Sequence, residues 1–141
     1  MIEQRVILDT SVLVALLSKG DRNHNWAVNQ WAQVNPPALT CDAVISETCF
    51  LLKRKYLIEA VFEMIEVGAI AIAFNLQEEA SNVRVLMSRY ESVPMSFADA
   101  CLVRMAELIP NSAVMTLDSD FKIYRKHRNE AITIILPNTC R

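Results

Sequence analysis

The stretch VILDTSVLVALL, residues 6–17, decides the fold class. It joins a short β-branched and aliphatic run over residues 5–8 to a helical pattern that begins after Asp9 and extends to Ser18. A continuous apolar run without polar alternation is typical of a strand that is buried on both faces of a sheet. Thr10 or Ser11 is expected to cap the helix that follows.

The same alternation of apolar strand and amphipathic helix continues outward from this stretch. Further strands are expected at residues 38–41, 69–74, 113–117 and 133–136, and helices at 25–34, from an Asp42 cap to 54 or 55, and at 56–67, 77–90 and 97–108. Alternating elements of this kind favour an α/β fold in which helices cover both faces of a parallel sheet. Because no repeat, linker or low-complexity segment interrupts the pattern, residues 1–141 are predicted to form one domain.

Composition excludes several classes of protein. Of the 141 residues 52% are hydrophobic, yet no apolar run approaches the roughly 20 residues that a membrane-spanning helix needs. The first residues lack the basic and apolar regions of a signal peptide, so we expect a cytoplasmic protein with no membrane contact. The formal net charge of −2 argues against electrostatic binding of nucleic acid over a large basic surface. Any such contact must be local or must be carried by metal ions.

Four cysteines are present, but their spacing matches no metal-binding or redox motif. Cys41, Cys49, Cys101 and Cys140 are far apart, with no C-x-x-C pair. In a cytoplasmic protein they are expected to be reduced and mostly buried thiols.

Four acidic residues occupy positions that should converge in space. Asp9 follows the first strand and Asp118 follows the fourth, while Asp99 lies in the first turn of the helix capped by Ser96. Glu47 lies near the start of the helix after the second strand. The carboxyl ends of parallel strands and the starts of the helices after them lie at one edge of the sheet, where open α/β folds bind ligands.

Clustered carboxylates repel one another, and a hard divalent cation removes this conflict. Mg²⁺ prefers oxygen ligands, and in phosphodiester hydrolysis it polarises the phosphoryl oxygen and activates water. Zinc is not expected, because His24 and His127, the two histidines, are far apart in the sequence. The competing interpretation is structural: such acids also serve as helix caps and salt-bridge partners, and Asp42 and Asp99 are well placed as caps.

These residues resemble the PIN-domain ribonucleases, and among them the VapC-type toxins of toxin–antitoxin pairs. The resemblance covers nearly the whole chain and rests on the segments VILDTSVLVALL, ISETCFLLKR, SFADACLVRMAE and VMTLDSDFKIYR, in this order. It implies a twisted parallel sheet of about five strands between helices. It also implies an endoribonuclease that uses Mg²⁺, or Mn²⁺ as a substitute, acts on RNA, forms a homodimer and is inhibited by a cognate antitoxin.

The resemblance assigns catalytic and metal-binding roles to Asp9, Glu47, Asp99 and Asp118. Asp9 and Asp99 are the foremost direct ligands, whereas Glu47 and Asp118 act either directly or through water. The resemblance also places Thr10 and Ser11 beside the first acid and Thr116 before the last, and it makes Asp120 a candidate accessory acid. It implies no organic cofactor site.

Three alternatives stay open at this stage. A PIN-domain nuclease without an antitoxin would show the same motifs. A receiver-type signalling domain has a similar length, but it normally carries an acidic pair after its first strand, where this chain has Asp9 followed by Thr10 and Ser11. A noncatalytic binding domain would not need four converging acids.

Overall fold

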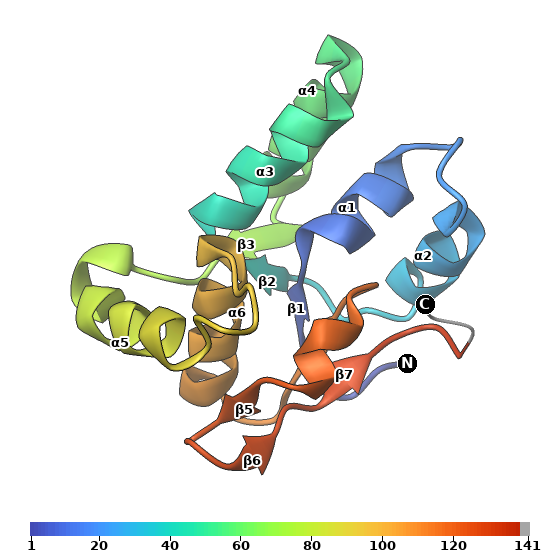
Figure 1. Ribbon diagram of the computed structural model, residues 1–141. Coiled ribbons are helices and arrows are strands. Elements are labelled where there is room, and N and C mark those ends of the chain that lie inside the picture. Colours follow the sequence, from blue (N-terminus) through green and yellow to red (C-terminus); the bar gives the residue numbers. More distant parts are fainter. Residues whose placement is uncertain (139–141) are drawn as a thin grey trace.

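The centre of the protein is a parallel sheet, seen in a computed structural model that describes residues 1–138 (Figure 1). Five strands pair in the order β3-β2-β1-β4-β7, and every pairing is parallel. The strands are β1 (Arg5–Leu8), β2 (Ala38–Thr40), β3 (Ile70–Ile72), β4 (Ser112–Met115) and β7 (Ile134–Ile135). This architecture confirms the predicted α/β fold and the five strands expected from the apolar runs.

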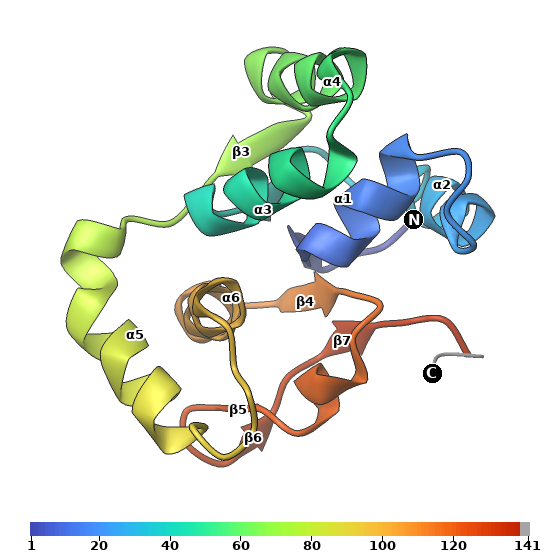
Figure 2. The same ribbon diagram turned by 45° about the horizontal axis from the view of Figure 1, so that its top comes forward.

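Six α-helices flank this sheet within the described part of the chain. They are α1 (Thr10–Leu17), α2 (His24–Trp31), α3 (Asp42–Leu52), α4 (Lys55–Glu66), α5 (Leu76–Arg89) and α6 (Phe97–Leu108). Figure 2 shows α1 and α2 on one side of the sheet and α5 and α6 on the other. Both faces of β1 and β4 are therefore covered, which explains why these strands are uninterrupted apolar runs.

The strand order places two of the predicted acids side by side. From β1 the chain continues to β2 and β3 on one side, whereas β4 and β7 lie on the other side. Leu8 pairs with Met115, and the backbone N–H of Asp9 donates to the carbonyl of Met115 at 3.1 Å. The segment after β1 therefore lies beside the segment after β4, at the point in the sheet where ligands bind in open α/β folds.

Two helix caps differ from the expectation. Asp9 itself caps α1, because its carboxylate accepts the backbone N–H of Thr10, so the cap is not Thr10 or Ser11. Cys41 occupies the cap position of α3, and Asp42 is the first residue of that helix. Asp42 still lies in the first turn, where a negative charge is favourable near the positive end of the helix dipole.

The segment between β4 and β7 contains elements that the sequence did not predict. A 3-10 turn, η1 (Ser119–Lys122), is followed by a small antiparallel hairpin of β5 (Arg125–Lys126) and β6 (Glu130–Ala131). Residues 127–129 connect the two strands, and His127 and Arg128 have φ values of 49° and 72°. Asn or Gly usually occupies positions of positive φ in tight hairpin turns, so His127 and Arg128 at these positions give no recognisable turn signal.

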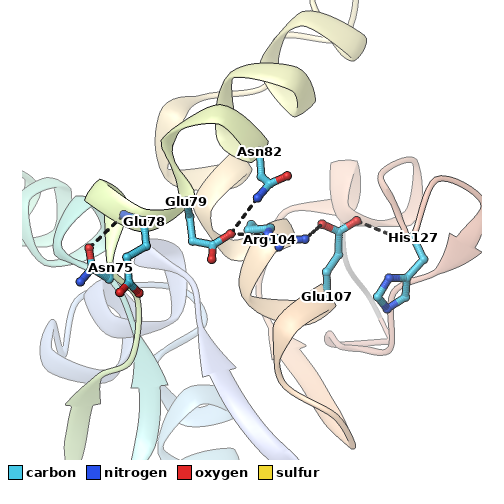
Figure 3. Close-up of polar contacts among 7 residues, drawn as sticks. All are labelled: Asn75, Glu78, Glu79, Asn82, Arg104, Glu107 and His127. Atoms are coloured by element: carbon cyan, nitrogen blue, oxygen red, sulfur yellow. Dashed lines mark hydrogen bonds and ion pairs between the residues drawn. The ribbon is translucent and has the colours of Figure 1, made fainter.

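A polar network fastens α6 to α5 and to the hairpin (Figure 3). The guanidinium of Arg104 on α6 donates to Glu79 of α5 at 2.6 Å and to Glu107 at 3.0 Å. The other carboxylate oxygen of Glu107 accepts the backbone N–H of His127 at 2.7 Å. The nearby side chain of Asn75 caps α5. Because α6 also carries Asp99, this network helps to fix the helix that presents one of the predicted acids.

The cysteine prediction is confirmed where the structure describes it. Cys41, Cys49 and Cys101 are free thiols, and Cys41 and Cys101 are buried. Cys140 lies outside the described residues. None of the helices in residues 1–138 combines the length and apolar character that a bilayer crossing requires.

Candidate active site

Asp9 is held in one orientation by hydrogen bonds to both of its carboxylate oxygens. Its Oδ1 accepts the backbone N–H of Thr10 at 2.7 Å. Its Oδ2 accepts the hydroxyl of Thr116 at 2.6 Å and a longer bond from Ser11 at 3.4 Å. The side chain is buried, so these donors compensate for the water that it has lost.

Asp99 is positioned by the start of α6 and by a tyrosine from a distant segment. It forms a capping box with Ser96: the Ser96 hydroxyl accepts the N–H of Asp99 at 3.0 Å, and Asp99 Oδ2 faces the N–H of Ser96 at 3.5 Å. The same Oδ2 accepts the hydroxyl of Tyr124 at 2.9 Å. Tyr124 is fully buried and makes edge contacts with the rings of Tyr90 and Phe121.

Thr116 connects Asp9 to Asp118. Its hydroxyl donates to Asp9 and accepts the backbone N–H of Asp118 at 2.9 Å. Asp118 in turn caps η1, because its Oδ1 accepts the N–H of Asp120 at 2.9 Å. The polar residue before the last acid is therefore a structural link between two of the predicted site residues.

All four predicted acids line one pocket of about 330 Å³. Its walls are formed by Asp9, Thr10, Ser11, Glu47, Leu51, Pro94, Ser96, Asp99, Asp118 and Asp120. Asp9 and Asp99 are buried, whereas Glu47 is exposed. The pocket therefore has two buried carboxylates and a more accessible acid, Glu47, on α3.

Comparison with known proteins assigns the chain to a family. The family model described as PIN domain matches residues 6–127. The chain belongs to the PIN domain family. The solved structure of Mycobacterium tuberculosis VapC20, a sarcin–ricin loop cleaving toxin, superposes with a TM-score of 0.65 at 23% sequence identity, covering 77% of this chain and 86% of that chain. At this identity the superposition supports the fold. No curated protein sequence matches the chain.

The carboxylates of this PIN domain affect one another electrostatically. Burial raises the pKa of Asp9 to about 6, and the charges of Asp99 and Asp118 add to the rise, while the hydrogen bonds from Thr116 and Thr10 oppose it. Burial also raises the pKa of Asp99, with a contribution from Asp118, and the Tyr124 hydrogen bond opposes this rise. The charge of Asp118 thus reaches both buried carboxylates and disfavours their ionisation.

The donor set of the PIN-domain pocket suits a hard divalent cation. Within residues 1–138 none of the four acids forms a salt bridge, since the ion pairs there join Arg104 to Glu79 and Glu107. Thr10 Oγ1 is buried without a hydrogen-bond partner and belongs to a residue of the pocket wall. The same part of the chain has no group of three or more acidic, His or Cys side chains arranged as a complete metal site. Mg²⁺ is commonly bound by one or two carboxylates and several waters, so it does not require such a group.

Tyr124 is a residue of this site that the sequence did not single out. It follows TLDSDF by three positions but contacts Asp99, which lies 25 residues earlier. A tyrosine in a mixed polar and apolar segment gives no periodic signal. Only the packing of the segment that leads into β5 against α6 brings its hydroxyl to the acid.

Proposed function

We propose that this PIN domain is a metal-dependent endoribonuclease and that Asp9, Glu47, Asp99 and Asp118 form its active site. The observation that carries the proposal is the single pocket lined by all four acids, in which buried carboxylates have no protein cation in the described chain to balance them. Mg²⁺ or Mn²⁺ would supply this charge. When bound, the ion polarises a phosphoryl oxygen of RNA and lowers the pKa of a water ligand.

The residues of the chain have distinct tasks in this proposal. Asp9 and Asp99 are the direct metal ligands, because both are buried and fixed by hydrogen bonds. Glu47 and Asp118 bind the ion directly or through water. Thr116 and Tyr124 are positioning residues that hold the carboxylates by donating to Oδ2 of Asp9 and Oδ2 of Asp99. Asp120, on the pocket wall, is the accessory acid.

The proposed biological role is that of the toxin in a toxin–antitoxin pair. The likeness to VapC20 and the sequence resemblance to VapC-type toxins support this role. In this role the protein would act in the cytoplasm, as a homodimer, and would bind a cognate antitoxin. Residues 1–141 would form one ribonuclease domain. An antitoxin would block the pocket with a basic side chain, because an arginine fork pairs with a carboxylate through two hydrogen bonds.

The test is cleavage of single-stranded RNA by the purified protein. Cleavage is expected with Mg²⁺ or Mn²⁺ and should stop with EDTA, and both Asp9→Asn and Asp99→Asn should abolish it. Glu66→Gln, which removes an exposed carboxylate of α4 outside the pocket, is the matched control and should cleave normally. Full activity in chelator would refute the metal mechanism. An inactive but well-folded wild type would favour a noncatalytic binding domain.

A further inference from the structure

A second pocket lies directly beside the acidic one, between α3 and the start of α6. It has a volume of about 430 Å³. It is lined by Ala43, Ser46, Glu47, Phe50, Ser96, Phe97 and Ala98. Glu47 and Ser96 line both pockets. The two hollows are therefore adjacent, and a chain bound at the acids can continue into the second one.

Two aromatic rings dominate the second pocket. Phe50 is 77% exposed and Phe97 is 41% exposed, although both stand in helices whose other faces pack on the core. Exposing a phenylalanine ring to water is unfavourable, and covering it with another flat apolar surface is favourable. Rings of this kind are the surfaces on which proteins stack the bases of single-stranded RNA.

The charge of the pocket excludes the RNA backbone as its occupant. Its lining contains no Lys or Arg, and the Glu47 carboxylate at the shared wall repels a phosphate. An uncharged base fits better, because the hydroxyls of Ser46 and Ser96 offer hydrogen bonds to a base edge. The Ser96 oxygen already accepts the N–H of Asp99, which leaves its own proton to donate.

We infer that this pocket binds a nucleobase of the RNA substrate, stacked on Phe50 and Phe97, next to the phosphate held at the acidic site. The inference rests on the proposed ribonuclease function and adds a base-binding subsite to it. The base would anchor the strand while the neighbouring phosphodiester lies at the carboxylates. The subsite then contributes to substrate affinity and to the choice of cleavage position, but not to the chemical step.

The test measures binding separately from cleavage. In an Asp9→Asn background, which removes hydrolysis, the affinity of a fluorescent single-stranded RNA octamer is compared with that of an abasic octamer of equal charge. Phe50→Ala should weaken RNA binding by about 5- to 150-fold, the range measured for loss of one base–aromatic stack, and should leave abasic binding unchanged. Phe50→Trp keeps an aromatic ring at this position and should bind the RNA octamer as tightly as the parent. Val85→Ala is the control, because Val85 is a half-exposed apolar side chain on α5 that lines neither pocket.

A second measurement uses the active protein. Phe50→Ala should raise KM and change the positions of cleavage while kcat changes little. If Phe50→Ala and Phe97→Leu bind both octamers like the parent, or if the parent binds them equally, the subsite is refuted even where metal-dependent cleavage is normal. If base-dependent binding is lost in Phe50→Ala but the wild type never cleaves RNA, the nuclease proposal fails and the base pocket stands. If Phe50→Ala alters only self-association in sedimentation, the pocket is a protein interface and the inference is wrong.

Discussion

At the scale of single residues, the buried carboxylate of Asp9 makes the stability of the metal-free protein depend on pH. Its pKa is raised from 3.8 to about 6, chiefly by burial. Between these values the folded protein keeps a proton that the unfolded chain has released, so the free energy of unfolding falls as pH rises. Above about pH 6 the loss is complete, and it is on the order of 3 kcal/mol at most for a shift of this size.

Asp9→Asn should therefore stabilise the metal-free protein at pH 8 by up to about 3 kcal/mol and have little effect at pH 4. The gain arises because asparagine removes the cost of ionising a buried group. Thermal unfolding in EDTA at the two pH values measures it, with Glu66→Gln as the control for a loss of charge on the surface. A lower Tm for Asp9→Asn at pH 8 would show that the carboxylate stabilises the fold.

Tyr124→Phe should weaken the metal site without disturbing the fold. The hydroxyl donates to Asp99 and opposes the rise of its pKa, so its removal should raise that pKa further. Mn²⁺ affinity should fall by roughly 10- to 150-fold, corresponding to about 1.5–3 kcal/mol for a hydrogen bond to a charged group, and the acid limb of its pH profile should move to higher pH. Calorimetric titration at several pH values measures both effects.

Tyr90→Phe is the matched control for this change. The Tyr90 hydroxyl accepts the backbone N–H of Arg125 at 2.9 Å, outside the acidic pocket. Tyr90→Phe, like Tyr124→Phe, removes one hydrogen bond, but it should leave the pH profile of Mn²⁺ binding unchanged. Equal effects of the two variants on that profile would mean that Tyr124 has only a packing role.

At the scale of elements, the first turn of α6 both starts a helix and presents Asp99. Ser96→Ala removes the side-chain half of the capping box and should lower stability by about 0.5–2 kcal/mol. It should also lower RNA cleavage, because the backbone that carries Asp99 loses its hydrogen bond. Asn75→Ala removes the corresponding cap of α5 and should cost similar stability while cleavage is unchanged. Denaturant unfolding and initial cleavage rates are the measurements, and equal cleavage rates for both variants would contradict the link.

Features that depend on neighbouring residues in the sequence could be predicted, whereas those that depend on tertiary contacts could not. Asp9 and Asp118 were recognisable because each follows a buried apolar run, and the parallel pairing of β1 with β4 brings their segments together. Ser96 was recognisable as a cap. Tyr124 was not, since its contact with Asp99 arises from tertiary packing. The hairpin was not, since His127 and Arg128, rather than Gly or Asn, hold the positive-φ positions of its turn.

At the scale of the whole molecule, apolar side chains of the helical stretch over residues 56–68, which includes nearly all of α4, are the basis for predicting a homodimer. Tyr56, Phe62 and Val67 are all exposed. Trp26 and Trp31, in contrast, pack partly against the core and are less available for an interface. Large exposed apolar surfaces commonly mark contacts between proteins. Sedimentation should give a mass of two chains at micromolar concentration, and Phe62→Glu should shift it toward one, whereas a single-chain mass for the wild type would contradict the prediction.

The central position of β1 has a consequence for synthesis of the protein. Asp9 is among the first residues made, yet the threonine that orients it comes 107 positions later, and Tyr124 follows Thr116. A growing chain therefore has no assembled acidic pocket until the segment through Tyr124 has left the ribosome. On the proposed function, a nascent chain would therefore be unable to cleave RNA, its own messenger included, during most of its translation.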